Sequence, residues 1–86
     1  MKDRVRYFLV PPGEISYIDC IVHAYDGLAV VRTLDGRVGL IEMLIAPDME
    51  EELSALIEDL AREVRIRELS PDDVALMGDH LDLSPL

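Results

Sequence analysis

The spacing of apolar and polar residues predicts four strands and two helices in this chain. Residues 4–10 alternate with a period of two, which is typical of a strand that has one apolar face. The side expected to face the core carries Val5, Tyr7 and Leu9. The outer side is expected to carry Arg4, Arg6 and Phe8. We expect this strand to end at Pro11, because proline has no N–H to donate to the ladder.

The period becomes helical after a Pro-Pro-Gly corner, from Glu14 onward. One stripe of this helix carries Ile15, Ile18, Val22 and Tyr25. Gly13 is expected to open the turn into the helix, and Gly27 to follow as the residue just past its end.

A hairpin follows, with strands expected over residues 28–34 and 38–46 and a turn at Asp35-Gly36. Asp48 and Glu51 then have the spacing of a capping box, which predicts the start of a second helix. The core stripe of that helix is Leu53, Leu56, Ile57, Leu60 and Val64. Residues 65–69 alternate again and predict a last, short strand.

This order of elements predicts an α+β fold, the ferredoxin-like βαββαβ arrangement, with an antiparallel sheet and both helices on one face. Right-handed crossovers place the first strand beside the third, and the fourth strand beyond the first. We expect residues 1–69 to form this domain. Residues 70–86 are expected to add a short helix, capped by Ser70 and ended by Gly78, and a tail that docks on its own or a neighbouring sheet. The apolar residues of that tail are Leu81, Leu83 and Leu86.

The formal net charge of −10 limits the classes of partner. A chain this acidic repels phosphate backbones, which argues against binding to nucleic acid or to an anionic membrane. No apolar run approaches the roughly 18 residues that a membrane span needs. The single cysteine, Cys20, excludes an internal disulfide and suits a reducing compartment, so we expect a cytoplasmic protein.

Side chains that could carry chemistry do not converge in the sequence. Cys20 and His23 lie three apart and share a helix face, so they could bind a metal or form a nucleophile pair, although the pair rests on spacing alone. Two ligands do not make a zinc site, and His80 is the only other histidine. The acidic residues of the second helix spread around its solvent side. We therefore expect no catalytic residue, no metal site and no cofactor, and predict that the protein is not an enzyme.

Two resemblances rest on the corner and its flanks. The pattern Pro12-Gly13-x-Ile15-x-x-Ile18 resembles the Pro-Gly-x-Leu signature of ACT domains, small βαββαβ modules that bind amino acids at paired interfaces. The stretches RYFLVPPGEISYI, AYDGLAVVRTLD and GLIEMLIAP resemble a short bacterial family catalogued only as a domain of unknown function.

The ACT resemblance implies a site for an amino acid or other small anion near Pro12, Gly13 and Glu14, at a subunit interface. Amide groups at the helix start could receive such an anion. ACT loops usually carry Asp or Asn before the Pro-Gly, whereas this chain has Val10 and Pro11. The alternative is that Gly13 serves only the turn.

The face of the sheet away from the helices is predicted to be both apolar and cationic. The residues expected there are Arg4, Arg6, Phe8, Leu40, Glu42, Leu44, Arg65 and Arg67, with Val30 and Arg32. Such a face predicts a non-catalytic association module that forms a homo-oligomer, most simply a dimer, or binds a protein partner. The alternatives are a solvated outer face and a sensor that binds a small anion near Gly13.

Overall fold

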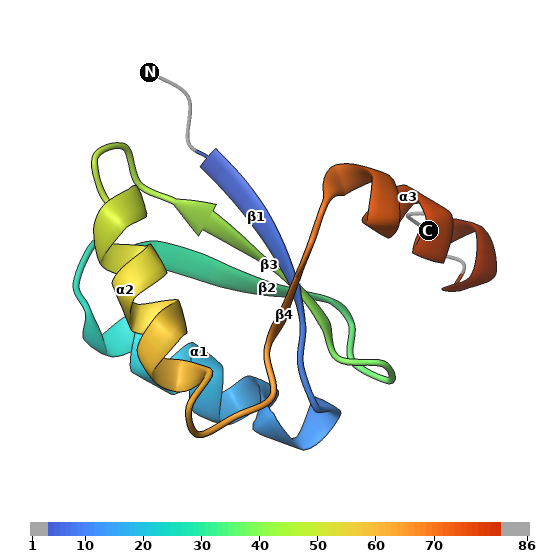
Figure 1. Cartoon of the computed structure of the whole chain (residues 1–86), viewed down its shortest axis with the longest axis horizontal. Coiled ribbons are helices and arrows are strands. Elements are labelled where there is room, and N and C mark those ends of the chain that lie inside the picture. Colours follow the sequence, from blue (N-terminus) through green and yellow to red (C-terminus); the bar gives the residue numbers. More distant parts are fainter. Residues whose placement is uncertain (1–3, 82–86) are drawn as a thin grey trace.

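The computed structural model describes the backbone of residues 4–81 and the side chains of residues 4–77, and it shows an α+β fold (Figure 1). Helices α1 and α2 pack on one face of a four-stranded antiparallel sheet. The elements are β1 Arg4–Leu9, a 3₁₀ turn η1 Pro12–Glu14, α1 Ile15–Ala24, β2 Ala29–Asp35, β3 Leu40–Ile45, α2 Glu50–Leu60, β4 Arg67–Leu69 and α3 Pro71–Leu81.

The order of strands in the sheet is β2-β3-β1-β4, and each neighbouring pair is antiparallel. This confirms the predicted ferredoxin-like arrangement, with β1 beside β3 and β4 outside β1. The order makes β2 and β4 the two edges of the sheet.

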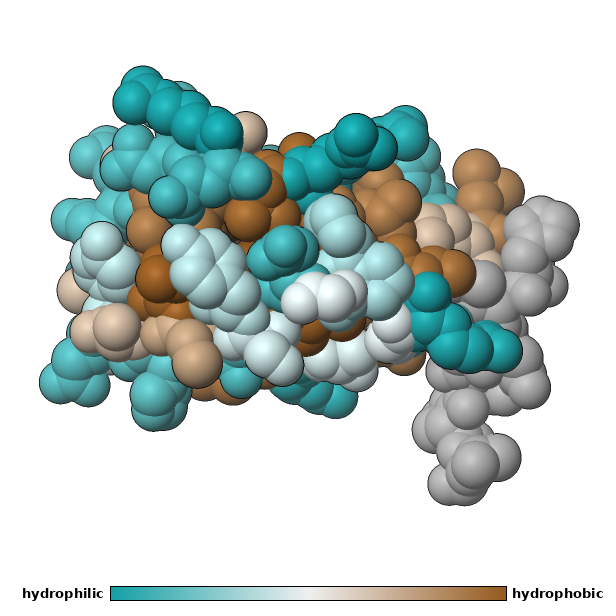
Figure 2. All heavy atoms as spheres, turned by 90° about the horizontal axis from the view of Figure 1, so that it is seen from below, coloured by the Kyte–Doolittle hydropathy of each residue, from teal (hydrophilic) through white to brown (hydrophobic). Residues whose placement is uncertain are grey.

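The core lies between the sheet and the two helices. The buried residues that α1 and α2 contribute are Ile18, Val22, Leu53, Leu56 and Leu60. Val64, just past the end of α2, is buried with them, and the strands contribute Phe8, Ile41, Met43 and Ile45. The predicted stripes are confirmed with two exceptions: Tyr25 is 53% exposed at the end of α1, and α2 ends at Leu60, before Val64. On the side of the molecule that Figure 2 shows, apolar and hydrophilic residues are interspersed, without a broad apolar patch.

The predicted facing of β1 is wrong. Phe8 is 0% exposed and lies opposite Ile41 of β3, so it points toward the helices. Because side chains alternate along a strand, Arg4 and Arg6 share that face and Val5, Tyr7 and Leu9 point the other way. The two arginines are tolerated there because their long side chains reach polar groups of α2. Arg4 Nε lies 3.2 Å from Glu50 Oε1, and Arg6 donates to Ser54 Oγ at 2.9 Å.

The start of α2 also differs from the prediction. The helix begins at Glu50, and its N-terminal cap, Met49, makes no side-chain capping hydrogen bond. Asp48 does not act as the cap. It has a φ of 71°, a conformation that aspartate adopts more readily than most residues.

Gly13 is not the glycine that the corner requires. Its φ is not positive, and a Cβ built on it would meet no atom within 4 Å. Gly39, at the end of the β2–β3 turn, has a φ of 82°, and its carbonyl accepts a 2.9 Å hydrogen bond from the N–H of Val10. A Cβ on Gly39 would lie 1.6 Å from Val10 O. The corner and the hairpin turn can therefore meet only because residue 39 lacks a side chain.

Helix α3 begins with the predicted cap. Ser70 Oγ accepts from the N–H of Asp73, and Asp73 Oδ2 accepts from the N–H of Ser70, both at 3.1 Å. This bonding to Ser70 lowers the pKa of Asp73. Contrary to prediction, the helix continues past Gly78 to Leu81. The expected docking of Leu83 and Leu86 lies outside the described residues, as does the side chain of Leu81. No helix in the described part of the chain is long and apolar enough to cross a membrane.

Candidate functional site

The edge strand β2 presents unpaired backbone groups along one side of the sheet. The N–H of Ala46 donates to the carbonyl of Leu28 at 3.2 Å, which identifies residues 28 and 46 as a hydrogen-bonded pair just before β2. Such pairs alternate along an antiparallel ladder, so Val30 and Arg32 bond to β3. The N–H and C=O groups of alternate residues then point away from the sheet: Ala29, Val31 and Thr33.

The two edges of the sheet differ in how they are protected. The outer edge, β4, has only three residues and continues directly into α3, which contacts it. The β2 edge has seven residues and no proline, and its irregularity lies at its end, between Thr33 and Asp35. Short strands, prolines and bulges are the usual devices that block edge pairing. The first five residues of β2 have none of them.

Apolar side chains lie next to this edge on the open face of the sheet. Val30 of β2 is opposite Leu44 of β3, and Leu44 is opposite Val5 of β1, which gives a row across three strands. Val30 is 59% exposed and Val5 41% exposed. In the next row, Arg32 and Glu42 form an ion pair of 3.3 Å. The open face is therefore apolar where β2 begins and polar immediately beside it.

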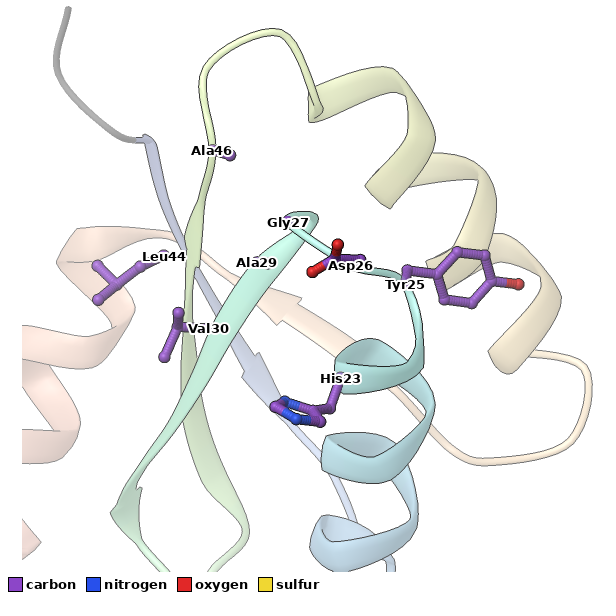
Figure 3. A pocket seen from close by; sticks show the side chains of 8 residues that line it. All are labelled: His23, Tyr25, Asp26, Gly27, Ala29, Val30, Leu44 and Ala46. Atoms are coloured by element: carbon purple, nitrogen blue, oxygen red, sulfur yellow. The ribbon is translucent and has the colours of Figure 1, made fainter.

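A hollow of about 420 Å³ lies at the beginning of β2 (Figure 3). It is bordered by the end of α1, the following turn and the two strands, through His23, Tyr25, Asp26, Gly27, Ala29, Val30, Leu44 and Ala46. The imidazole of His23 points from α1 toward β2, and the carboxylate of Asp26 projects from the turn. The hollow thus adds two polar side chains to the exposed backbone edge.

The predicted interface residues do not all lie on one surface. Leu40, Glu42, Leu44 and Arg67 lie on the open face, as predicted, together with Val30 and Arg32. Arg4, Arg6 and Phe8 lie on the helix face and are removed from this set. Leu40 is fully buried, so it offers no surface to a partner.

Arg6 in particular is occupied within the chain. Its guanidinium donates to both carboxylate oxygens of Glu68, at 2.9 and 2.7 Å, and lies over the ring of Phe8. The bonding to Glu68 raises the pKa of Arg6, and the bonding to Arg6 lowers the pKa of Glu68. Arg6 therefore joins β1 to β4 and α2 instead of forming part of an interface.

The predicted anion site at the helix start has few amide groups to offer. Pro11 and Pro12 have no N–H, the N–H of Glu14 donates to Pro11 O at 2.8 Å, and that of Ile15 donates to Pro12 O. Pro12 does line a different hollow of about 430 Å³, together with Arg65 and Arg67. Gly13 and Glu14 do not line it. The proposed ligand at Pro12, Gly13 and Glu14 stays a prediction.

No catalytic constellation is assembled in the described part of the chain. Cys20 and His23 are both exposed on α1. No group of three or more His, Cys, Asp or Glu side chains among the described residues could hold a metal ion.

The β2 edge was not predicted as a site, although one signal pointed to it. The predicted order of strands already makes the second strand an edge, and the sequence of residues 29–33 contains no proline and a single charged residue, Arg32. Which backbone groups face outward could not be predicted, because this depends on the register with β3.

Comparisons with known proteins agree with one of the two resemblances. The model of a family described as "Domain of unknown function (DUF4911)" matches residues 8–64, which run from the end of β1 through α2. No curated protein matches the chain, and no solved structure does. The likeness to ACT domains thus stays a resemblance of one short motif.

Proposed function

This chain belongs to the DUF4911 family, and we propose that it is a non-catalytic association module whose β2 edge pairs with the β2 edge of a second copy. The observation that carries the proposal is the unprotected run of outward-facing backbone groups at Ala29, Val31 and Thr33. A strand that adds to such an edge gains main-chain hydrogen bonds, and neighbouring side chains give specificity.

The geometry favours one antiparallel register, centred on Val31. In this register Val31 lies opposite Val31 of the second copy, and Ala29 lies opposite Thr33, so all three outward-facing residues of each copy are paired. A shift by two residues in one direction would pair Ala29 with Asp35, whose carbonyl already accepts from the N–H of Gly39 at 3.1 Å. A shift in the other direction would place Thr33 opposite Gly27, which precedes β2. The register centred on Val31 is therefore the one that uses every available group.

Side chains are compatible with this register. Val30 lies opposite Arg32 of the second copy on the open face, so the two arginines do not face each other directly. Arg32 is already paired with Glu42. The register also directs the hairpin turn of the second copy, which carries Arg37, toward the hollow beside Asp26 and His23. Arg37 is itself paired with Asp35 at 3.2 Å, so the two side chains together add no net charge beside Asp26.

Substitution of Thr33 tests the proposal. Thr33→Pro removes an outward-facing N–H without removing a hydrogen bond between β2 and β3, and Thr33→Ser is the matched control that keeps the N–H. We expect the wild type and Thr33→Ser to be dimers by analytical ultracentrifugation, and Thr33→Pro to be a monomer with an unchanged circular dichroism spectrum. A wild type that stays monomeric up to about 1 mM, the range of very weak association, would refute the proposal.

Amide hydrogen exchange gives a second test that does not depend on a substitution. In the dimer, the amides of all residues from Ala29 to Thr33 are protected. In a monomer, protection alternates, with Val30 and Arg32 slow and Val31 fast. Dilution should convert the first pattern into the second. An alternating pattern at every concentration would show that the edge stays open, whatever the association state.

A further inference from the structure

The end of the sheet near the Pro-Pro-Gly corner contains a hollow with apolar walls and a cationic rim. The apolar walls come from the end of β1, the corner and the hairpin turn, and two arginines lie where β4 begins. The lining residues are Leu9, Val10, Pro11, Pro12, Val38, Arg65 and Arg67. Three segments that are distant in the sequence thus meet around one space: residues 9–12, the hairpin turn and the start of β4.

The contact between the corner and the hairpin turn builds this hollow. The hydrogen bond from Val10 to Gly39 holds Val38 beside the corner, and β4 places Arg67 directly opposite Leu9. Gly39 permits this approach, as described above. The walls are therefore held by sheet register and a main-chain bond, not by flexible side chains.

Among the described residues, both arginines at the rim, Arg65 and Arg67, lack an acidic partner within 4.0 Å, as Arg62 does. Arg4, Arg6, Arg32 and Arg37 each form an ion pair with a carboxylate. Arg67 is nevertheless near enough to Asp73 to help lower the pKa of that carboxyl. Two cationic side chains thus lie exposed beside an apolar surface, on a molecule with a net charge of −10.

We propose that this hollow binds a small carboxylate with a branched apolar body. The carboxylate would accept hydrogen bonds from Arg65 and Arg67, since a guanidinium matches a carboxylate with two parallel donors. The apolar body would lie against the prolines, Leu9 and Val38. A volume of about 430 Å³ suits a small molecule. The inference goes beyond the proposed function, because none of the residues that line the hollow belongs to the proposed pairing edge, β2.

Nuclear magnetic resonance titration tests the inference with defined probes. The probe is 3-methylbutanoate, compared with 3-methylbutanamide, acetate and inorganic phosphate. We expect saturable shifts of the amides of Leu9, Val10, Val38 and Gly39 with 3-methylbutanoate, at concentrations up to about 10 mM. The neutral amide and the two anions without an apolar body should bind at least about ten-fold more weakly.

Substitution of both rim arginines tests whether they bind the carboxylate of the probe. Arg65→Gln with Arg67→Gln should weaken binding at least about ten-fold, because two charge-assisted hydrogen bonds are lost. Arg62→Gln is the matched control, since Arg62 is also exposed and does not line the hollow. An absence of saturable shifts at these amides, equal binding of the neutral amide or of phosphate, or unchanged binding by the double variant would overturn the inference.

The association proposal can fail without affecting this result. Thr33→Pro should bind 3-methylbutanoate as the wild type does, because the hollow is complete within one copy. Loss of binding in Thr33→Pro would overturn that statement and place the site at a subunit boundary.

Discussion

Adding one methyl group at Gly39 should remove a large part of the free energy of unfolding of this domain. An alanine there adopts a φ of 82°, which costs an L-residue about 1 to 2 kcal/mol. Its Cβ would also lie 1.6 Å from Val10 O and 2.8 Å from the carbonyl carbon of Val10. Both contacts are to backbone, so no side chain can rotate away, and the turn and the corner must separate.

That separation breaks the hydrogen bond from Val10 to Gly39, and Val10 is a core residue that is 4% exposed. A buried N–H left without a partner costs about 1 to 3 kcal/mol. Together with the conformational cost, Gly39→Ala should lower the free energy of unfolding by about 2 to 5 kcal/mol. The total free energy of unfolding of a domain of this size is about 4 to 13 kcal/mol.

The assay is urea denaturation followed by circular dichroism, with Gly36→Ala as the matched control in the same turn. Gly36 does not have a positive φ, and its added Cβ would meet only Thr33 Cγ2, at 3.7 Å. Gly36→Ala should therefore stay within about 1 kcal/mol of the wild type. A Gly39→Ala variant that is also within about 1 kcal/mol would refute the argument that the corner and the turn depend on this glycine.

Two further predictions concern the ion pair between Arg6 and Glu68 and the exposed side chains of Cys20 and His23. Glu68→Gln should lower the free energy of unfolding by about 1 kcal/mol at neutral pH through its bond to Arg6, whereas Glu52→Gln, on the exposed start of α2, should not. Because the folded pKa of Glu68 is lowered, its contribution is present above the unfolded value and is lost as the pH falls below about 4, so urea melts of the two variants should converge there. His23→Ala should leave the rate of Cys20 alkylation unchanged, since both side chains are exposed on α1; a drop of about ten-fold would instead support a nucleophile pair.

The fold could be predicted from the sequence because periodicity changes clearly between elements. Residues 15–22 follow a helical period and residues 41–45 a strand period, and these patterns place the core stripe of α1 and the inner face of β3 correctly. The connections between them then allow few topologies. The strand order could therefore be predicted from the sequence alone.

The facing of β1 could not be predicted in the same way, because both of its sides are apolar in part. A one-residue difference in register exchanges the two sides of a strand. Val5, Tyr7 and Leu9 outnumber Phe8, so a count of apolar residues chose the wrong side. Val10 has the same parity as Phe8 and is also buried, so it was the residue that indicated the correct side of β1.

The sequence predicts that the corner needs Gly13, whereas the structure needs Gly39, and the reason for this error is different. Gly13 lies in an evident corner, so the sequence suggests that it is needed there, whereas Gly39 is needed because of a residue 29 positions earlier. A close approach between two backbones depends on tertiary structure and leaves no local pattern. The hollow beside Arg65 and Arg67 depends on the same approach and was missed with it.

Besides an interface on the open sheet face, the sequence suggested an anion bound at a subunit interface, and our two proposals place association and anion binding apart. The proposed pairing edge is β2, whereas none of the residues that line the arginine-rimmed hollow belongs to β2. A ligand in that hollow would contact the corner from the side of the hairpin turn, not at the amide groups of the helix start, most of which are already bonded. Binding and association therefore need not be coupled through direct contact. If they are coupled, the coupling must pass through the β1–β3 ladder or through the hairpin turn that links β2 to the wall of the hollow.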